Sequence, residues 1–130
     1  MHAYTYSGHP TCCAVALANL DIIENEGLVA NAGARGTQLL EGLKGLEAEF
    51  EVIGNVRGLG LMCAVEFVAD RGTKAPAGIG EKVRKACVER GLFTRAIGDI
   101  LAFAPPIVIN GDEVDQVVQI VGEAIAAVTG

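Results

Sequence analysis

The chain alternates between stretches whose apolar residues recur at helical spacing and stretches that favour short strands. From Pro10 to Asp21, small and apolar residues keep the helical spacing, and a proline suits a first turn, where its missing N–H is not needed. This helix is expected to end at 24–26, with Gly27 able to adopt the left-handed conformation that closes helices. Because the segment is small and almost uncharged, we expect it to pack closely on another surface.

A second helix is expected over residues 28–49, and the period of the pattern then changes. The four glycines of this helix lower its propensity, so it should depend on tertiary packing. Residues 52–56 predict a short strand, 57–60 a tight bend, 61–68 a longer and mostly buried strand, and 70–78 a polar loop. The apolar stripe of the second helix is Leu39, Leu40, Leu43 and Leu46.

The second half of the chain predicts a helix and a hairpin. Ile79 begins an amphipathic stretch that Gly91 closes. Residues 92–96 and 100–104 are expected to pair as antiparallel strands around a turn at Gly98-Asp99. Pro105 and Pro106 then end the second strand.

The last helix has the clearest start signal. Asn110 suits the N-cap, and Glu113 follows three residues later, as in a capping box. The order helix, helix, strand, strand, helix, strand, strand, helix predicts an α+β fold, with helices on one face of a small, largely antiparallel sheet. The first helix is the outlier of this order. Residues 28–130 are therefore expected to form the α+β domain.

Composition limits the classes of function. Half of the residues are hydrophobic (51%) but only 5% are aromatic, with no tryptophan, so the core should be aliphatic. The net charge is −6 and lysines and arginines do not cluster, which argues against nucleic acid as a partner. The longest uncharged stretch near the N-terminus is too short to span a bilayer, and no signal peptide is recognisable.

The four cysteines do not suggest a metal site. Cys12 and Cys13 are adjacent, Cys63 and Cys87 are distant, and there is no C-x-x-C pair with a nearby histidine pair. We interpret all four as small buried hydrophobic residues in a reducing cytoplasm.

Arg95 is the first candidate for chemistry. It lies between Phe93 and Ile97 on the alternating pattern of an apolar strand, just before the predicted turn. A guanidinium can hold a carboxylate through two parallel hydrogen bonds. The alternative is an ordinary solvent-facing arginine on an edge strand, and the pattern alone favours that alternative. Glu66, in the other apolar strand, requires either a partner such as Arg57 or exposure at the sheet face.

The segment from Tyr4 to Pro10 is the second candidate. Its hydroxyl groups precede a helix N-terminus, where the helix dipole favours an anion. The alternative, of equal weight, is a plain N-cap with Ser7 as the capping residue. His9 has no identifiable nucleophile beside it and is expected to be structural. The Arg57-Gly58-Leu59-Gly60 run resembles a phosphate loop only weakly, because it leads into a strand rather than a helix.

Taken together, several segments resemble one known family. They occur in order along nearly the whole chain: HAYTYSGHP at 2–10 followed by A-x-ANL-x-II at 16–23, VRGLGLM at 56–62 through Glu66, GLFTRAIGD at 91–99 followed by APP at 104–106, and EVD at 113–115. The set resembles the C-terminal part of class III pyridoxal-phosphate aminotransferases. The YSGHP form is more similar to the ω-amino acid and amine:pyruvate branch of that family.

The resemblance implies a fold and roles for four residues. The family has the fold-type I architecture and works as homodimers, so residues 1–27 would be a cofactor-phosphate loop and connecting helix, and 28–130 the C-terminal small domain. Thr5 would bind the phosphate of pyridoxal 5'-phosphate in the neighbouring subunit, with Tyr4 and Tyr6 beside it. Arg95 would pair with the substrate carboxylate and swing aside for an amine donor.

The resemblance also implies what the chain lacks. In the family, the lysine that binds the cofactor covalently lies upstream of the threonine segment, and none of Lys44, Lys74, Lys82 and Lys85 corresponds to it. We therefore expect a fragment that is inactive alone, although its whole enzyme would pass an amino group from an amine or amino acid to a keto acid such as pyruvate. The alternatives are a free-standing association or regulatory module without catalysis, and an aminomutase or decarboxylase of the same fold.

Overall fold

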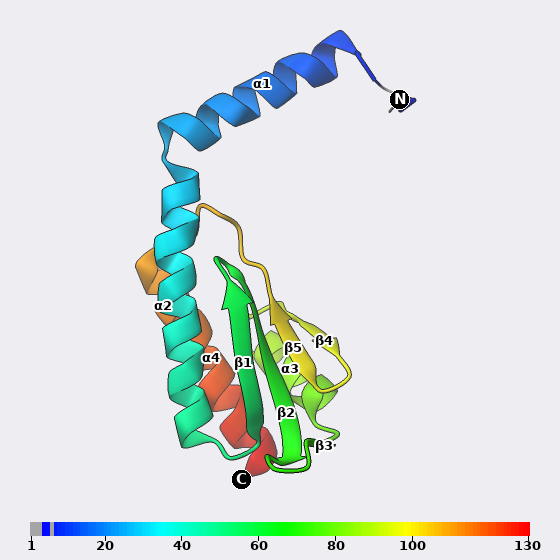
Figure 1. The fold of residues 1–130 in the computed structure, drawn as a ribbon, viewed down its shortest axis with the longest axis vertical. Helices are drawn as coiled ribbons and strands as arrows, with labels where there is room; N and C mark the ends of the chain where they lie inside the picture. The colour runs from blue at the N-terminus through cyan, green and yellow to red at the C-terminus, as the bar shows by residue number, and fades with distance from the viewer. Residues whose placement is uncertain (1–3, 6) are drawn as a thin grey trace.

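The computed structural model describes residues 4, 5 and 7–130. Two helices come first along the chain, and they differ in how much of their surface is packed. Helix α1 (Pro10–Asn25) is followed by Gly27, whose φ of 61° is the left-handed conformation predicted there. Helix α2 (Leu28–Glu49) then runs in a new direction along the sheet (Figure 1). Both helices occupy the predicted residues.

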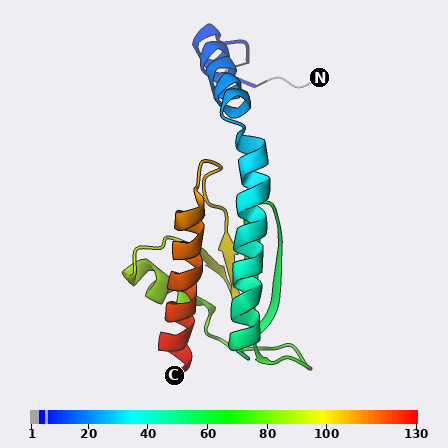
Figure 2. The same cartoon turned by 90° about the vertical axis from the view of Figure 1, so that its left-hand side faces the viewer.

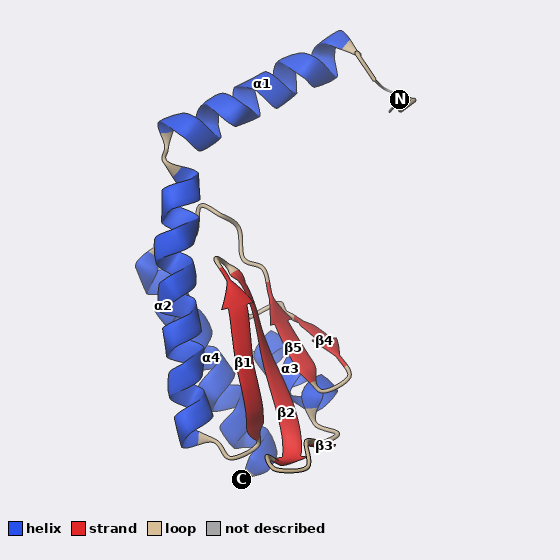
Figure 3. Ribbon diagram, viewed as in Figure 1, coloured by secondary structure: helices blue, strands red, loops and turns tan. Residues whose placement is uncertain are grey.

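The sheet forms the second layer of the molecule, and all of its described pairings are antiparallel (Figure 3). Its main path is β1 (Ile53–Leu59), β2 (Met62–Asp70), β5 (Ile100–Phe103) and β4 (Arg95–Ile97), in that spatial order. A two-residue strand, β3 (Ala75–Pro76), pairs with the end of β2. Strand β4 therefore lies at an edge, with β5 beside it.

Three helices cover one face of the sheet and leave the other face open (Figures 1 and 2). They are α2, α3 (Gly80–Glu89) and α4 (Gly111–Thr129). Helix α4 begins with the predicted capping box, in which Asn110 Oδ1 accepts from the Glu113 N–H at 2.9 Å and Glu113 Oε2 accepts from the Asn110 N–H at 2.9 Å. The predicted α+β class is confirmed.

The core lies between these helices and the sheet. On β2, the alternating residues Cys63, Val65 and Phe67 face the helices and are at most 4% exposed. Their main partners from the helices and from β5 are Leu39, Leu43, Val83, Leu101, Val114, Val121 and Ile125. As the composition indicated, this core is mostly aliphatic.

Two details of the strands differ from the prediction. The bend expected at 57–60 is narrower, because Arg57 to Leu59 belong to β1 and the turn consists of Gly60 and Leu61. Only Gly60 needs to be glycine for its conformation, with φ of 54°, whereas a Cβ at Gly58 would lie 2.6 Å from Cys63 Sγ. Strand β3 was also missed, because it lies inside the segment read as a polar loop.

Helix α1 is unlike the rest of the fold, since none of its sixteen residues is buried. It projects from the top of α2, away from the sheet (Figure 1). Four of its large apolar side chains are about half exposed or more, namely Val15 64%, Leu17 63%, Leu20 54% and Ile22 48%, and Ile23 is partly exposed. The close packing expected of this helix is not supplied by the described part of this chain.

Candidate functional site

Arg95 lies at the start of edge strand β4, on the open face of the sheet. Its neighbour Ala96 packs against the core, so the alternation of the strand directs Arg95 and Ile97 away from the helices. The side chain of Arg95 is exposed. This is the surface strand position that the sequence pattern predicted.

A cross-strand row of small and basic residues surrounds Arg95 on the open face. Arg95 is opposite Ala102, Ala102 is opposite Ala64, and Ala64 is opposite Arg57. The two arginines are thus separated by three strand spacings, or roughly 14 Å at the backbone. The two residues between them are alanines, whose small side chains leave space beside each guanidinium.

The two arginines of this row differ in their partners. Arg57 Nη1 lies 2.7 Å from Glu66 Oε2 and 3.0 Å from Asn55 Oδ1, so its charge is already compensated. Both alternatives for Glu66 hold, because it pairs with Arg57 and its side chain is 39% exposed. Among the described residues, Arg95 has no side-chain hydrogen bond and no ion pair. Of the two, Arg95 is therefore the guanidinium that can receive an anion.

The backbone around Arg95 is held from two sides. Thr94, which is only 7% exposed, donates from Oγ1 to the carbonyl oxygen of Ala102 at 2.7 Å and extends the β4–β5 pairing by one residue. On the other side, the turn residue Asp99 accepts at its own carbonyl oxygen from the Phe67 N–H at 2.8 Å. The strand that carries Arg95 is thereby joined to both β5 and β2.

The Asp99 side chain adds a third connection. Its Oδ1 accepts from the N–H groups of Ile79 (2.8 Å) and Gly80 (2.9 Å), and its Oδ2 accepts from Gly78 (2.8 Å). Burial of the carboxyl opposes its ionisation, but these hydrogen bonds outweigh burial and lower the pKa of Asp99 below its usual value. A carboxylate thus caps the N-terminus of α3 from another element, where the helix dipole favours it.

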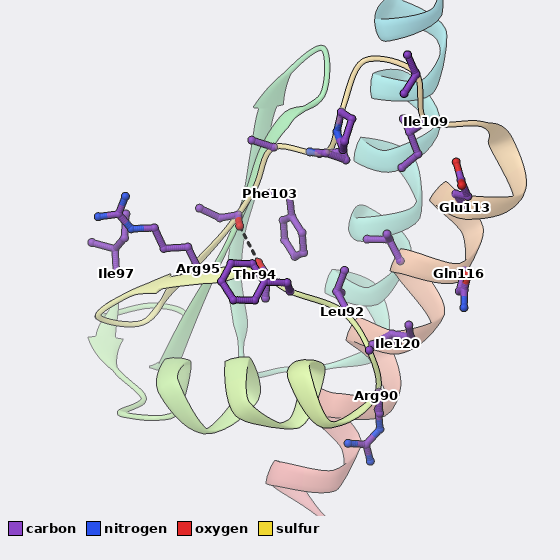
Figure 4. A pocket seen from close by; sticks show the side chains of 18 residues that line it. Arg90, Leu92, Thr94, Arg95, Ile97, Phe103, Ile109, Glu113, Gln116 and Ile120 are labelled. Carbon is purple, nitrogen blue, oxygen red and sulfur yellow. Dashed lines mark hydrogen bonds between the residues drawn. The ribbon is translucent and has the colours of Figure 1, made fainter.

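An open apolar cavity of about 800 Å³ lies next to this strand, between the 90–97 segment, the 102–109 segment and α4. Leu92, Phe103 and Ile120 are among its lining residues. Figure 4 shows that Arg95 and Ile97 lie at its rim and point away from the hollow. Arg95 and Ile97 nevertheless belong to the lining, so the guanidinium lies where the cavity meets the open face of the sheet.

The second candidate site lies before α1. Tyr4 and Thr5 are exposed in a turn, in which the Ser7 N–H donates to the Tyr4 carbonyl oxygen at 2.9 Å. Helix α1 begins after His9, and no side chain of the described residues caps it. The alternative that Ser7 is its N-cap is therefore wrong. Tyr6 lies outside the described residues.

The structure does not bring the two candidate sites together within this chain. Helix α1 carries the turn with Tyr4 and Thr5 away from the sheet, whereas Arg95 lies on β4 (Figure 1). Any shared ligand would need residues from another polypeptide region or another copy. The candidate sites are therefore two partial surfaces rather than one closed pocket.

The cysteines only partly match the prediction. Cys63 and Cys87 are buried, and burial raises the pKa of the Cys63 thiol and that of Cys87 to about 11, which keeps both protonated. Cys12 and Cys13 are exposed, so their expected burial is wrong for this chain. Their helix forms, but the described residues do not cover it.

In the part of the chain that the structure describes, each helix is too short or too polar to cross a bilayer.

The fold and the arginine-bearing hairpin define a class of protein. The chain belongs to the class-III aminotransferase family, whose sequence profile matches residues 1–125. It is 46% identical over 98% of its length to aminotransferase y4uB of Sinorhizobium fredii, which is described as uncharacterized. Over 98% of its length, it is 43% identical to the diaminobutyrate–2-oxoglutarate transaminase of Halomonas elongata.

Solved structures share the fold. An amine transaminase from an uncultivated Pseudomonas species, in its PLP-bound form, matches 98% of the chain with a TM-score of 0.92 and 42% identity. The omega transaminase of Pseudomonas jessenii, in complex with PMP, matches 98% with a TM-score of 0.91 and 41% identity. The chain spans 28–30% of the length of these four proteins. The resemblance to class III aminotransferases and the α+β fold are both confirmed.

Proposed function

We propose that these residues are the C-terminal part of a pyridoxal-phosphate-dependent transaminase, which moves an amino group from an amine or ω-amino acid to a keto acid such as pyruvate. The observation that carries the proposal is the state of Arg95. Its guanidinium is exposed on the open sheet face, without a side-chain partner among the described residues, while Thr94 holds the backbone beside it. The family membership and the amine and omega transaminases among the similar structures support the same branch.

Arg95 would bind the substrate carboxylate. A planar guanidinium can form two parallel hydrogen bonds to a carboxylate, and Ala102 beside it leaves space for the ligand to approach. An amine donor has no carboxylate, and the exposed side chain is free to swing aside for it. One arginine would then serve both amine donors and keto-acid acceptors.

Thr5 would bind the cofactor phosphate of the partner subunit in a homodimer, with Tyr4 and Tyr6 beside it. The chemistry of the described residues fits a phosphate. Hydroxyl groups at Thr5 and Ser7 precede a helix whose N-terminus no described side chain caps and whose first turn has no acidic residue. Such a helix end supplies free N–H groups and a favourable dipole to an anion.

Pyridoxal phosphate, when bound, supplies the chemistry that accepts an amino group from the donor and gives it to the acceptor. The residues of this chain would bind and orient the reactants. The chain would divide after Gly27: residues 1–27 would form the phosphate loop and connecting helix, and residues 28–130 the small domain. We further propose a cytoplasmic enzyme.

The 130-residue chain by itself is expected to be inactive. Lys44 belongs to α2, Lys82 and Lys85 belong to α3, and Lys74 Nζ donates to the Gly54 carbonyl oxygen at 2.9 Å. None of these lysines lies in the turn before α1 or beside Arg95 on β4. The covalent attachment that transamination requires would come from residues outside this chain.

A second candidate function rests on α1. Because this helix leaves Val15, Leu17, Leu20 and Ile22 exposed, the chain could serve as an association module in which α1 is the contact surface. The isolated chain distinguishes the two functions. Turnover of an amino donor by the chain alone in the presence of pyridoxal phosphate would contradict the fragment proposal. A stable oligomer without such activity would favour the association module.

The decisive experiment compares the two arginines of the cross-strand row in a complete enzyme that carries these residues. We expect Arg95→Ala to raise the KM for keto acids and amino acids by roughly ten- to hundredfold, the value of a hydrogen bond to a charged group, and to spare simple amines. Arg57→Ala is the matched control, because it removes the same side chain from the same row but leaves the carboxylate site intact. Thr5→Ala should weaken retention of pyridoxal phosphate. Equal effects of the two arginine variants would contradict the role of Arg95.

A further inference from the structure

We propose that Asp99 is a positioning residue that fixes the backbone of Arg95 relative to α3 and β2. The inference rests on the proposed function of Arg95 as the carboxylate-binding residue. It starts from a weakness of β4, which is three residues long and pairs with β5 at the edge of the sheet. Such a strand has little ladder bonding of its own to hold the arginine in place.

Asp99 supplies what the ladder lacks. Its carboxylate accepts the three hydrogen bonds from Gly78, Ile79 and Gly80, and its carbonyl oxygen accepts the fourth from Phe67. These bonds join the turn after β4 to the N-terminus of α3 and to strand β2. Hydrogen bonds to a charged group are stronger than those between neutral groups, so the carboxylate form of the side chain is the effective anchor.

The contact between the turn and α3 is also sterically tight. A Cβ at Gly80 would overlap the carbonyl oxygen of Gly98, so the first residue of α3 and the turn meet backbone to backbone. Gly98 itself has φ of 60°, a conformation that favours glycine. The two glycines allow the approach, and Asp99 holds it.

This anchor acts on the backbone and leaves the guanidinium free. None of the four hydrogen bonds of Asp99 involves Arg95, and the turn follows Arg95 by only three residues. The side chain can therefore reorient between substrates while its Cα stays in place. Loss of the anchor should impair the binding of carboxylates and not the use of simple amines.

The test uses a complete enzyme that carries these residues, with the half-reactions of an amino acid donor and a simple amine donor measured separately. Because misplacement by about 1 Å can cost about a hundredfold, we expect Asp99→Ala to raise the KM for the amino acid about tenfold or more. The kcat/KM for the amine should stay within about twofold. Asp99→Asn, which keeps one acceptor oxygen, should fall between wild type and Asp99→Ala.

Two controls separate positioning from mere stability and from the underlying function. Val83→Ala weakens α3 from its buried side and removes none of the hydrogen bonds of Asp99, so it should leave the ratio of the two KM values unchanged. A ratio shifted equally by Val83→Ala and Asp99→Ala overturns the positioning role. If Arg95→Ala shifts the ratio and the Asp99 variants do not, Asp99 has no such role. If Arg95→Ala leaves the ratio unchanged, the proposed function and this inference both fail.

A measurement without catalysis completes the test. In the 130-residue chain, Asp99→Asn should accelerate amide hydrogen exchange in β4 and at 78–80 more than Val83→Ala does. Unchanged exchange in β4 overturns the inference, because the strand would then be held without the anchor. Should Asp99→Ala fail to fold, Asp99→Asn serves for both the kinetic comparison and the hydrogen-exchange measurement.

Discussion

Helices α1 and α4 are both rich in apolar residues, but only α4 uses them within the chain. Helix α4 buries one face against α2 and α3 and begins with a capping box, whereas α1 buries nothing and has no side-chain cap among the described residues. The buried residues of α4 are Val114, Val121, Ala124 and Ile125. Helical spacing thus predicts that a helix forms, but burial depends on whether another surface reaches it.

This difference divides the chain into regions of unequal sensitivity. The body, residues 28–130, contains the whole described core, so its unfolding should be cooperative. Helix α1 can melt without opening that core, because no buried side chain belongs to it. Equivalent substitutions in the two regions should therefore have different effects on the free energy of unfolding. Two matched pairs measure that difference, and a third pair compares two positions inside the body.

The largest difference is expected for a pair of leucines. Leu43 is fully buried and Leu17 is 63% exposed. Leu43→Ala should lower the free energy of unfolding by about 2–5 kcal/mol, through lost burial and the cavity left behind. Leu17→Ala should change it by no more than about 0.5 kcal/mol. Urea titration of the two variants and the wild type, monitored by circular dichroism, gives both values.

The same pair reveals any hidden partner of α1. A loss for Leu17→Ala as large as that for Leu43→Ala, growing with protein concentration, would show that copies of the chain bury α1 between them. Light scattering on the wild type then gives the oligomeric state. In that case the contrast between α1 and the body would hold for one copy and not for the assembly.

The sequence predicted best those features whose signals are local. Gly27 between the first two helices and the Asn110 and Glu113 pair before the last are each recognisable within four residues, and all three lie where expected. Arg95 was also placed correctly, on a strand just before a turn. Its proposed role, however, came from the resemblance, because the alternating pattern alone favoured an ordinary surface arginine.

The features that were missed depend on contacts between distant residues. Gly58 was read as part of a bend, but it lies in strand β1, where Cys63 approaches too closely for a side chain. The three partners of the Asp99 side chain lie 19–21 residues away, so the turn was visible in the sequence and its anchor was not. Exposure of Cys12 and Cys13 likewise depends on what packs against α1.

The second pair of substitutions tests close packing inside one helix of the body. A Cβ at Gly36 would overlap the backbone of Gly60, whereas a Cβ at Gly33 would meet nothing within 4 Å. We expect Gly36→Ala to cost about 1–3 kcal/mol, because α2 must move away from the β1–β2 turn. Gly33→Ala should stabilise the chain by up to about 1 kcal/mol through helix propensity. Thermal unfolding that shifts in the same direction for both would contradict this contact.

The smallest difference concerns the helix caps. Asn110→Ala removes the acceptor for the Glu113 N–H and should cost about 1 kcal/mol, within a range of about 0.5–2 kcal/mol. His9 is the N-cap of α1, but its side chain makes no capping bond to the described residues, so His9→Ala should alter the free energy of the cooperative transition by no more than about 0.5 kcal/mol.

The two cap variants separate local from global unfolding. A cap on α4 stabilises residues that are buried in the core, so its loss lowers the midpoint of the cooperative transition. A change at the start of α1 can only alter fraying of a helix that the core does not contact, and its signal should be confined to amide exchange within α1. A midpoint shift for His9→Ala as large as that for Asn110→Ala would mean that α1 unfolds together with the body. Helix α1 would then be coupled to the core through its junction with α2 at Gly27, although none of its own residues is buried.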